Sequence, residues 1–550
     1  MTENVLYYGD NLDILRRYIA DESVDLIYLD PPFKSAQDYN ILFAEQNGSR
    51  AAAQIKAFED TWQWDKAAAR AYQDVVESGP ERVSQTMQGF RLLLNESDMM
   101  AYLAMMAPRL VELRRVLKET SSIYLHCDTT ASHYLKNLMD AIFGPLNFRN
   151  EIIWKRSQPK SHTKIRFSRA HDIILFYGRT QEGGFFQQYK KHDPKYLEKF
   201  YHHVEEGTNR RYMLGDLTNP NKNRPNLTYE FPPGSGVVRV WRWTRERMMK
   251  AWRQGRVIIP DKGKIVREKR YLDEMSGSPV TDMWDDIEHL HGSHKESLGY
   301  PTQKPEGLLE RIIKASSNEG DMVLDPFCGC GTAIVVAEKL KRRWMGIDIT
   351  HLAVALMRHR LKDTFGDKVN YKVIGERVSL PDAKTLAENN AFQFQWWALG
   401  LVGARPAEGK KGADRGIDGR LYFHDEPDSR KRRTKQVVIS VKSGSVSVRD
   451  VRDLRGVVER ESAQIGLLIS MEKPTGPMKK EADSAGFYKS PWRKEPYPKV
   501  QIRTIEELLS GKQIDCPPLG QVNVTFKKAP KAKRNPSALK IQNDLFENNS

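Results

Sequence analysis

A carboxylate stands directly after an apolar run near the start of the chain and is followed by two prolines and an aromatic ring, Asp30-Pro31-Pro32-Phe33. The run from Val24 to Leu29 is typical of a parallel strand buried on both faces, and the prolines end it. Ligands bind at the carboxyl edge of such a sheet. There Asp30 and a prolyl carbonyl can accept the hydrogens of a planar base amine, and Phe33 can stack on the base. The tetrapeptide alone is equally compatible with a turn that ends a strand.

A second stretch has the pattern of strand, glycine turn and helix, from Met322 to Leu340. Another short strand, 344–348, follows it and ends in Asp348. Glycines let the backbone approach a nucleoside closely, and an acid that ends the next strand can accept hydrogen bonds from ribose hydroxyls. No Lys-Ser/Thr pair follows the glycines, which excludes a phosphate-binding loop of the Walker type.

Together these stretches resemble the β group of S-adenosylmethionine-dependent amino-methyltransferases that act on DNA. Asp30-Pro31-Pro32-Phe33 is similar to the catalytic motif of that family, and Phe327 to Gly331 is similar to its Phe-x-Gly-x-Gly cofactor loop. In the β group the catalytic motif precedes the cofactor loop in the sequence, as it does here. Tyr300 to Pro305 matches its Pro-Thr-Gln-Lys-Pro segment, and Gly9-Asp10 matches its Gly-Asp segment. The resemblance covers roughly residues 1–375 and rests on four motifs in the right order.

The resemblance implies S-adenosylmethionine as cofactor and methyl transfer to the N6 amine of adenine, flipped out of duplex DNA. Asp10 is also expected to cap the helix that follows it. The residues implied in catalysis are Asp30, Pro31, Pro32 and Phe33. Those implied in cofactor binding are Asp10, Lys304, Asp325, Phe327, Gly329, Gly331, Thr332 and Asp348.

Three other functions stay open. The N4 amine of cytosine is one, although the cytosine enzymes of the family more often begin the motif with Ser. A restriction nuclease with a protective methyltransferase half is the second. Methylation of a protein glutamine amide is the third, and it is disfavoured because that family begins its motif with Asn.

Composition favours a polyanionic partner, because 87 Lys and Arg against 71 Asp and Glu give a net charge of +16 in 550 residues. Solubility alone is the alternative explanation. Four cysteines, at 127, 328, 330 and 516, have neither zinc nor disulfide spacing, which suits a reducing compartment. No stretch approaches the ~20 apolar residues that span a bilayer. We therefore expect a cytoplasmic protein that does not contact membranes.

Three features around the motifs are open to both structural and functional interpretation. Residues 34–95 predict mostly helices over the mouth of the site, with Trp62 and Trp64 either clamping a displaced base or forming a small satellite core. His126 and Asp128 end a predicted strand, and we favour a structural role for both because this chemistry needs no histidine base. Aromatic and basic residues alternate in 180–300, where the resemblance implies a target-recognition region that contacts phosphates and base edges.

A composition break at 380–392 predicts a linker before a second module. In that module Asp418 begins one strand and Lys442 ends the next, as in nucleases of the restriction-endonuclease-like fold that hold a divalent metal. The module resembles the Mrr-like branch of that fold but has Ser440 where the branch carries Glu or Gln. Asp414, Glu459 or Glu461 could supply the missing acid for Mg²⁺. We expect weak or conditional cutting, with a DNA-binding clamp as the alternative.

The predicted fold class is therefore α/β, with a doubly wound, mostly parallel methyltransferase sheet, an inserted recognition region and a smaller restriction-endonuclease-like domain. The expected domains are 1–385, which includes the recognition region 180–300, then 386–515 and a basic, disordered tail over 516–550. The expected partner is double-stranded DNA. The sequence leaves open both a homodimer and a partner subunit of a restriction-modification system.

Overall fold

The structure is a computed structural model, and the described part of it divides into two compact units. Residues 187–281 form one unit, and the remaining described residues form the other. The described residues are 3–32, 64–157, 165, 167–259, 265–291, 294, 296–298, 302–375, 380–389, 391–407, 416–423, 434–491 and 495–517. Among them no helix is long and apolar enough to cross a bilayer.

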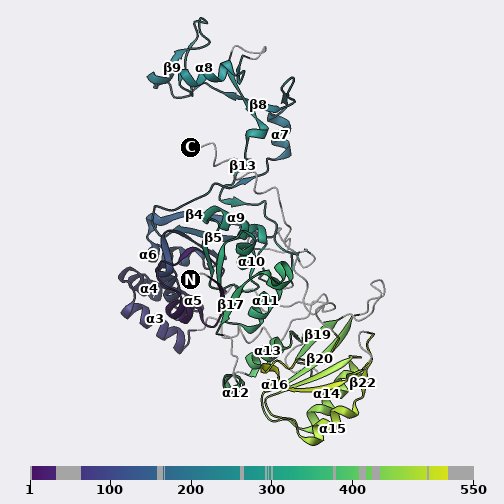
Figure 1. Cartoon of the computed structure of the whole chain (residues 1–550). Coiled ribbons are helices and arrows are strands. Elements are labelled where there is room, and N and C mark those ends of the chain that lie inside the picture. Colours follow the sequence, from purple (N-terminus) through teal and green to yellow (C-terminus); the bar gives the residue numbers. More distant parts are fainter. Residues whose placement is uncertain are drawn as a thin grey trace. The chain divides into compact units, whose positions relative to one another are not determined.

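A nine-stranded sheet is the centre of the larger unit (Figure 1). In order across the sheet, its strands are β14 (Met283–Trp284), β4 (Phe148–Lys155), β5 (His171–Gly178), β3 (Leu117–Cys127), β2 (Val24–Leu29), β15 (Met322–Asp325), β16 (Arg343–Asp348), β1 (Asn4–Tyr8) and β17 (Tyr371–Ile374). Among these described strands β5 alone is antiparallel to its neighbours. The predicted mostly parallel α/β sheet is confirmed.

The direction of winding reverses between β2 and β15. From β2 the chain moves on to β3 on one side, whereas from β15 it moves on to β16 on the other. In sheets of this kind, a ligand crevice forms outside the carboxyl ends of the strands at such a switch point. The two motifs found in the sequence therefore flank the place where the fold itself favours binding.

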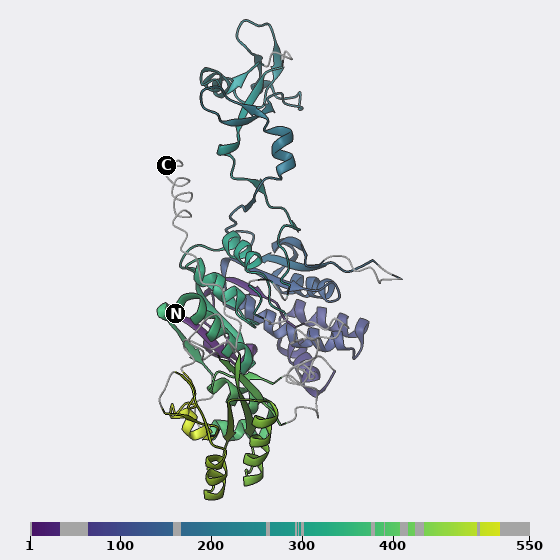
Figure 2. The ribbon, with the colours of Figure 1, turned by 90° about the vertical axis from the view of Figure 1, so that its right-hand side faces the viewer.

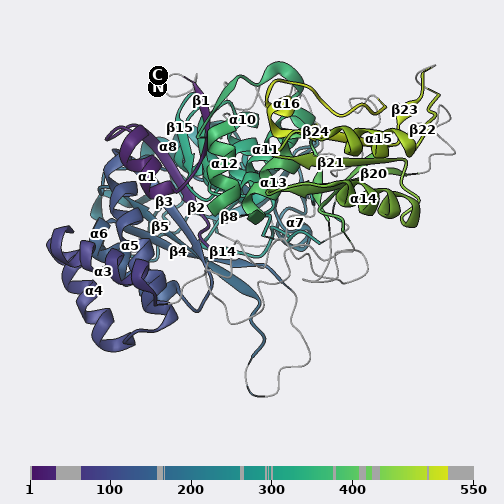
Figure 3. The same ribbon diagram turned by 90° about the horizontal axis from the view of Figure 1, so that it is seen from below.

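Helices cover both faces of this sheet, as Figures 1 and 3 show for α3 to α6 on one side and α10 and α11 on the other. One large core joins α1 and the first group to the strands through Leu15, Leu103, Leu110 and Leu138. The helices, with one short turn of 3-10 helix after each set, are α1 (Asn11–Tyr18), α3 (Lys66–Ser78), α4 (Glu81–Leu94), α5 (Asp98–Val116), α6 (Ser132–Phe143) and η1 (Pro145–Asn147), then α9 (Glu306–Ser316), α10 (Thr332–Lys339), α11 (His351–Phe365) and η4 (Gly366–Lys368).

The predicted helices of the segment 34–95 are present in its described part, α3 and α4, which pack on α5 and α6. Trp64 packs against the main core, edge-on to Tyr72 with ring centroids 5.9 Å apart, and the Arg91 guanidinium lies 4.5 Å from its ring centre. Trp64 therefore has a packing role, but in the main core and not in a separate satellite core. Trp62 lies outside the described residues.

The smaller unit, 187–281, has its own sheet of four strands and its own core. Trp241, Phe231, Met248 and Leu217 are the centre of that core. The elements, in chain order, are β6 (Tyr189–Lys190), α7 (Pro194–Phe200), β7 (His203–Val204), β8 (Arg211–Asp216), η2 (Pro225–Leu227), β9 (Thr228–Glu230), β10 (Val238–Val240), α8 (Arg245–Arg253), β11 (Val257–Ile258), β12 (Arg267–Tyr271), η3 (Leu272–Glu274) and β13 (Ser278–Pro279).

The C-terminal module is a five-stranded sheet in the order β18-β19-β20-β21-β24, with a core on each face. Figures 1 and 2 show α14 and α15 side by side in it. Its elements are α12 (Leu380–Asn389), α13 (Ala391–Leu401), β18 (Arg405–Pro406), β19 (Gly419–Phe423), β20 (Lys435–Lys442), α14 (Val448–Arg460), β21 (Ile465–Ser470), α15 (Gly476–Ser484), β22 (Phe487–Tyr488), β23 (Tyr497–Pro498), β24 (Val500–Thr504) and α16 (Ile505–Leu509).

The predicted linker at 380–392 is wrong in the structure, because α12 and α13 occupy it. Ala383 and Leu386 of α12 share one core with Leu399 of α13 and Leu421 of β19. Burial of these apolar side chains holds the segment in the module, so the core of the module begins before residue 386. Of the expected tail, 516–550, residues 518–550 lie outside the described residues.

Candidate active site at the carboxyl edge of the sheet

Four neighbouring parallel strands, β2, β15, β16 and β1, end at the same edge of the large sheet. The residues that follow or end them are Asp30, Asp325, Asp348 and Gly9-Asp10. Segments from the two ends of the sequence are thus brought together, and all but two of the implied site residues lie on or near these strand ends. The exceptions are Lys304, which comes from the segment before α9, and Phe33, which lies outside the described residues.

Asp30 is held by an ion pair with Lys304, whose ammonium donates to Oδ2 of the carboxylate. The two side chains are 17 and 14% exposed, so water can still reach the pair. No donor within the described residues reaches Oδ1 of Asp30. The resemblance implied a cofactor role for Lys304, whereas here its ammonium contacts the carboxylate of Asp30, the residue implied in catalysis. Pro31 is buried and Pro32 half-buried at the strand end.

Asp325 ends β15 and is 3% exposed. Burial raises the pKa of its carboxyl well above the usual range, and the charges of Asp30 and Asp348 raise it further. The backbone N–H of Phe327 donates to Oδ1 over 3.1 Å, which opposes that rise. Asp325 therefore fixes the start of the glycine loop through this hydrogen bond, although burial makes its carboxyl hard to ionise.

The glycine loop is tied to Asp348 by a hydrogen bond from the backbone N–H of Gly329, 2.9 Å from Oδ2. Gly329 and Gly331 have φ of 48° and 73°, a left-handed backbone that favours glycine. A Cβ on Gly331 would also lie 2.5 Å from Cγ of Met357. The backbone N–H and hydroxyl of Thr350 both donate to Oδ1 of Asp348 over 2.8 Å. A carboxylate accepts about four hydrogen bonds, so Asp348 retains room for one more.

Asp10 caps α1, as expected, by accepting hydrogen bonds from the backbone N–H groups of Leu12 and Asp13 over 2.8 and 3.4 Å. Its other oxygen pairs with Arg109 over 2.7 Å. Arg109 also donates to Asn11, and the Asn11 amide donates to the carbonyl of Pro326 in the glycine loop over 2.9 Å. Our sequence analysis missed this connection. Its signal was a single arginine within the otherwise apolar run of α5.

Thr332, implied in cofactor binding, is 6% exposed and accepts a hydrogen bond from Arg360 over 3.0 Å. The same guanidinium donates to the carbonyl of Cys330 over 3.0 Å and pairs with Glu306 over 3.1 Å. In the structure Thr332 therefore takes part in holding the loop to α9 and α11. Its contact with the cofactor stays a prediction.

A buried polar chain lies behind Asp30 and supports the structural role expected for His126. The hydroxyl of Tyr28 is 2.9 Å from Nδ1 of His126, and Nε2 of His126 is 3.2 Å from Asp172. Asp172 also pairs with Arg156 over 3.0 Å. Burial acts to raise the pKa of Asp172, but His126 and Arg156 hold it below the usual value. Asp128, the other residue in question, accepts from the backbone of Thr130 and Ala131 and so shapes the turn before α6.

In the C-terminal module, Asp418 and Lys442 lie at the same end of the antiparallel pair β19–β20. Oδ2 of Asp418 accepts from the Ser440 hydroxyl over 3.2 Å and from the backbone N–H of Val441 over 2.7 Å. Lys442 lies 3.8 Å from Asp450. The described residues contain no group of three His, Cys, Asp or Glu suited to a metal ion.

The acids considered as substitutes for the missing ligand have other roles. Glu459 pairs with Arg455 over 3.4 Å, and Glu461 pairs with Arg420 over 2.8 Å. Asp414 lies outside the described residues. The metal assignment of Asp418 therefore stays a prediction, and it has no supporting ligand among the residues described.

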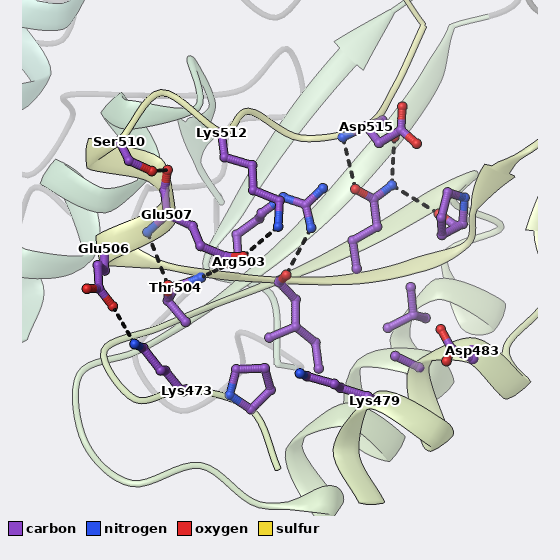
Figure 4. Close-up of a pocket in the computed structure, with 16 residues that line it drawn as sticks. Lys473, Lys479, Asp483, Arg503, Thr504, Glu506, Glu507, Ser510, Lys512 and Asp515 are labelled. Carbon is purple, nitrogen blue, oxygen red and sulfur yellow. Dashed lines mark hydrogen bonds and ion pairs between the residues drawn. The ribbon is translucent and has the colours of Figure 1, made fainter. Parts of the chain in front are cut away.

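A shallow groove of the same module runs along β24 between α15 and α16 (Figure 4). Two ion pairs cross its lining, since Lys473 pairs with Glu506 over 3.1 Å and Lys512 pairs with Glu507 over 2.6 Å. Neither Asp418 nor Lys442 lines it. The groove is thus separate from the nuclease-like residues.

Comparisons with known proteins agree with this geometry. Residues 24–358 match the family described as "DNA methylase", N6_N4_Mtase, and residues 390–510 match "NACHT-associated inactive Restriction Endonuclease 1". The Type II methyltransferase M.EcaI of Enterobacter cloacae is 27% identical over 387 residues, which cover 69% of this chain and 74% of that protein. The Type III restriction-modification enzyme StyLTI Mod subunit of Salmonella typhimurium is 26% identical over 407 residues, 71% of this chain and 58% of that protein.

Among solved structures, TTHA0409 of Thermus thermophilus, described as a "Putative DNA Modification Methylase" and complexed with S-adenosyl-L-methionine, aligns with a TM-score of 0.32 at 14% identity. The alignment covers 67% of this chain and 97% of that one.

Proposed function

The chain belongs to the N6/N4 DNA methylase family, and from this we propose that it transfers a methyl group from S-adenosylmethionine to the N6 amine of adenine in duplex DNA. One observation carries the proposal. The Asp30-Pro31-Pro32 corner and the glycine loop 325–332 flank the switch point between β2 and β15, where both can reach one ligand pocket.

The residues at this edge suit a nucleoside cofactor. Asp348 has acceptor capacity left for one ribose hydroxyl, and the loop that it holds has the backbone conformation that only glycine adopts without strain. Asp325 and Phe327 begin that loop. S-adenosylmethionine supplies a methyl group on a sulfonium centre. We propose that Asp348, Asp325 and the loop backbone hold it.

Asp30 would act on the base. Lys304 donates to Oδ2 of Asp30 and so fixes the orientation of the carboxylate. The second oxygen, Oδ1, can then accept an N–H of the target amine. This hydrogen bond keeps the nitrogen lone pair available for the methyl group. The carboxylate also stabilises the positive charge that develops on the nitrogen as it becomes tetrahedral. The carbonyl of Pro31 is the second candidate acceptor, and Phe33 is the candidate stacking residue. A proton then leaves the nitrogen, with Asp30 as its first acceptor or as the residue that orients a water to take it.

Adenine rather than cytosine is the finer part of the proposal, because the family includes both kinds of enzyme. It rests on Asp30 at the first motif position, where cytosine enzymes more often carry Ser. Methylating duplex DNA with the purified protein, digesting it to nucleosides and separating these by mass spectrometry distinguishes the two. N6-methyladenine is expected. If only N4-methylcytosine is found, the target base is cytosine and not adenine. If no methylated base is found, the proposal is refuted.

We also propose a role for this chain as one subunit of a restriction-modification assembly. StyLTI Mod is by its name a subunit of a Type III restriction-modification enzyme, and we propose that this chain likewise modifies DNA for a separate restriction subunit in the cytoplasm. The recognition region is proposed to be the unit 187–281, within the interval 180–300 expected from the sequence. Co-expression with the neighbouring genes followed by affinity purification would test for such a subunit.

A further inference from the structure

The recognition unit carries a strong excess of positive charge that is unevenly distributed along its sequence. Residues 187–281 contain 20 Lys and Arg against 11 Asp and Glu, a net charge of +9. The sheet part, 203–216 and 256–274, has eight basic and seven acidic residues, whereas the basic segment, 217–255, has eight basic and two acidic ones. Two thirds of the excess is therefore in the basic segment.

Five of the six described cations of the sheet part have acidic partners within it, and the sixth, Arg211, donates to the carbonyls of Tyr201 and Leu197. Arg210 pairs with Asp273 and Glu274, Arg270 pairs with Glu268 over 2.7 Å, and Lys269 pairs with Glu205 over 3.0 Å. Arg256 and Arg267 have acidic partners too. Hydrogen bonds from Tyr271 and Lys269 lower the pKa of Glu205 to about 2, so this acid stays charged. These cations hold the sheet together and are already matched.

The basic segment is different, because its eight cations are exposed and form no ion pair with any described residue. They are Lys222, Arg224, Arg239, Arg242, Arg245, Arg247, Lys250 and Arg253. Of its two acids, Glu230 accepts the backbone N–H of Gly236 over 2.7 Å. On α8, Met248 and Ala251 are buried, and helical spacing puts Lys250 and Arg253 on the opposite side. The eight cations outnumber the two acids of the segment by six, so an anion that binds there relieves their mutual repulsion.

Internal contacts also hold the basic segment in place, and such preorganisation lowers the entropy lost on binding. Trp241 is buried, donates to the carbonyl of Tyr229 over 2.9 Å and packs against Phe231. The guanidinium of Arg242 is anchored to the carbonyl of Thr218 over 3.1 Å, and that of Arg247 lies 4.3 Å from the ring centre of Trp243. Figures 1 and 2 show β9 and α8 together at the end of this unit remote from β13.

We propose that residues 217–255 are the part of the unit that grips the phosphate backbone of duplex DNA, whereas the sheet part is a scaffold that makes little contact with phosphates. This inference rests on the proposed function and deepens it. Phosphate contacts position a protein on DNA, and each one releases counterions, so the number of contacts is read from the salt dependence of binding.

The test compares two triple variants that each remove three positive charges. Arg239→Gln/Lys250→Gln/Arg253→Gln removes unpaired cations of the basic segment, and the matched control, Arg210→Gln/Arg267→Gln/Arg270→Gln, removes paired cations of the sheet part. Binding of the full-length protein to a 30-base-pair duplex of random sequence is measured by fluorescence anisotropy at several salt concentrations. Thermal unfolding establishes that each variant is folded.

In the basic-segment variant the slope of log K against log salt should fall by about 2.7, the value for three phosphate contacts, with an affinity loss on the order of 100-fold near 0.1 M salt. In the control the slope should stay within about 0.5 of the wild-type value. Replacing the same three positions with the other cationic residue, Arg239→Lys/Lys250→Arg/Arg253→Lys, should restore the slope. Equal slopes in the two Gln variants, or a larger change in the control, would overturn the inference. Wild type that binds no DNA and methylates none would instead refute the proposed function.

Discussion

The ammonium of Lys304 donates to Oδ2 of Asp30, although 274 positions separate the two residues in the sequence. The pair connects the segment before α9 to the end of β2, and it orients the carboxylate that we propose for the target amine. The ammonium also acts on Asp325, whose pKa it lowers against the larger effect of burial.

We expect Asp30→Ala to lose ~100-fold or more in methyl transfer, because one preorganised electrostatic contact in a transition state contributes about this much. Affinity for S-adenosylmethionine should be nearly unchanged, since Asp348 and the glycine loop remain. Single-turnover kinetics and calorimetry measure the two quantities. Parallel losses of affinity and rate would show that Asp30 belongs to the cofactor site instead.

Lys304→Met should lower kcat for methyl transfer and leave the affinity for S-adenosylmethionine nearly unchanged. Without the ammonium, Oδ2 of Asp30 loses its ion-pair partner, so the carboxylate is no longer held in one orientation toward the target amine. Lys304→Arg keeps the charge and is the control, with a kcat closer to that of wild type. If both variants keep the wild-type kcat and only KM for S-adenosylmethionine rises, Lys304 serves the cofactor as the resemblance implied.

Asp325→Asn should stabilise the protein at neutral pH. Burial raises the pKa of Asp325 in the folded state, so the unfolded chain releases this proton first as the pH rises. Wild-type stability from this group is therefore present at low pH and is lost as pH rises from about 4, the ordinary Asp value, toward the higher folded value. The amide oxygen of Asn can still accept the N–H of Phe327. Urea unfolding at pH 8 should give a higher free energy of unfolding for Asp325→Asn than for wild type. The difference should vanish near pH 4.

Asp348→Ala should weaken binding of S-adenosylmethionine by about 1–3 kcal/mol, the usual contribution of a hydrogen bond to a charged group. The change also removes the anchor of Gly329, so Thr350→Val is the appropriate comparison, because it perturbs the same carboxylate and leaves its oxygens in place. Calorimetry on both variants separates the roles. Unchanged affinity in Asp348→Ala would move the ribose site elsewhere.

For the C-terminal module we now expect no cleavage of unmethylated plasmid in Mg²⁺ or Mn²⁺, rather than the weak cutting predicted from the sequence. Asp418 is bonded to Ser440 and Val441, and one carboxylate holds Mg²⁺ poorly. Comparing wild type with Asp418→Ala and Lys442→Ala checks this. Cutting by wild type that both substitutions abolish would establish a nuclease.

The sequence predicted the local elements of the site well, because strong local signals define them. The apolar run before Asp30 and the prolines after it define β2, and Gly329 and Gly331 define the turn after β15. Contacts between distant segments had no signal that named both partners. The pairs of Lys304 with Asp30 and of Arg109 with Asp10 depend on how the sheet is assembled.

The error at residues 380–392 has a physical cause as well. The segment is rich in Ala and Asn with few aliphatic residues, so its composition is typical of a linker. Ala383 and Leu386 nevertheless reach a core that later strands supply. Local composition could not reveal that core, since Leu421 and Ile505 are far away in the chain.

The position of β15 and β16 has a consequence for how the protein is made. These two strands fill the space between β1 and β2, yet the ribosome adds them roughly 300 residues after β2, which at 5–20 residues per second is about 15–60 s later. Throughout that interval β1 and β2 of the emerging chain each have an unpaired edge. Such edges can pair with the wrong strand or bind a chaperone. It also has no cofactor loop. A nascent polypeptide therefore cannot modify DNA before the unit proposed to select the target has been synthesised.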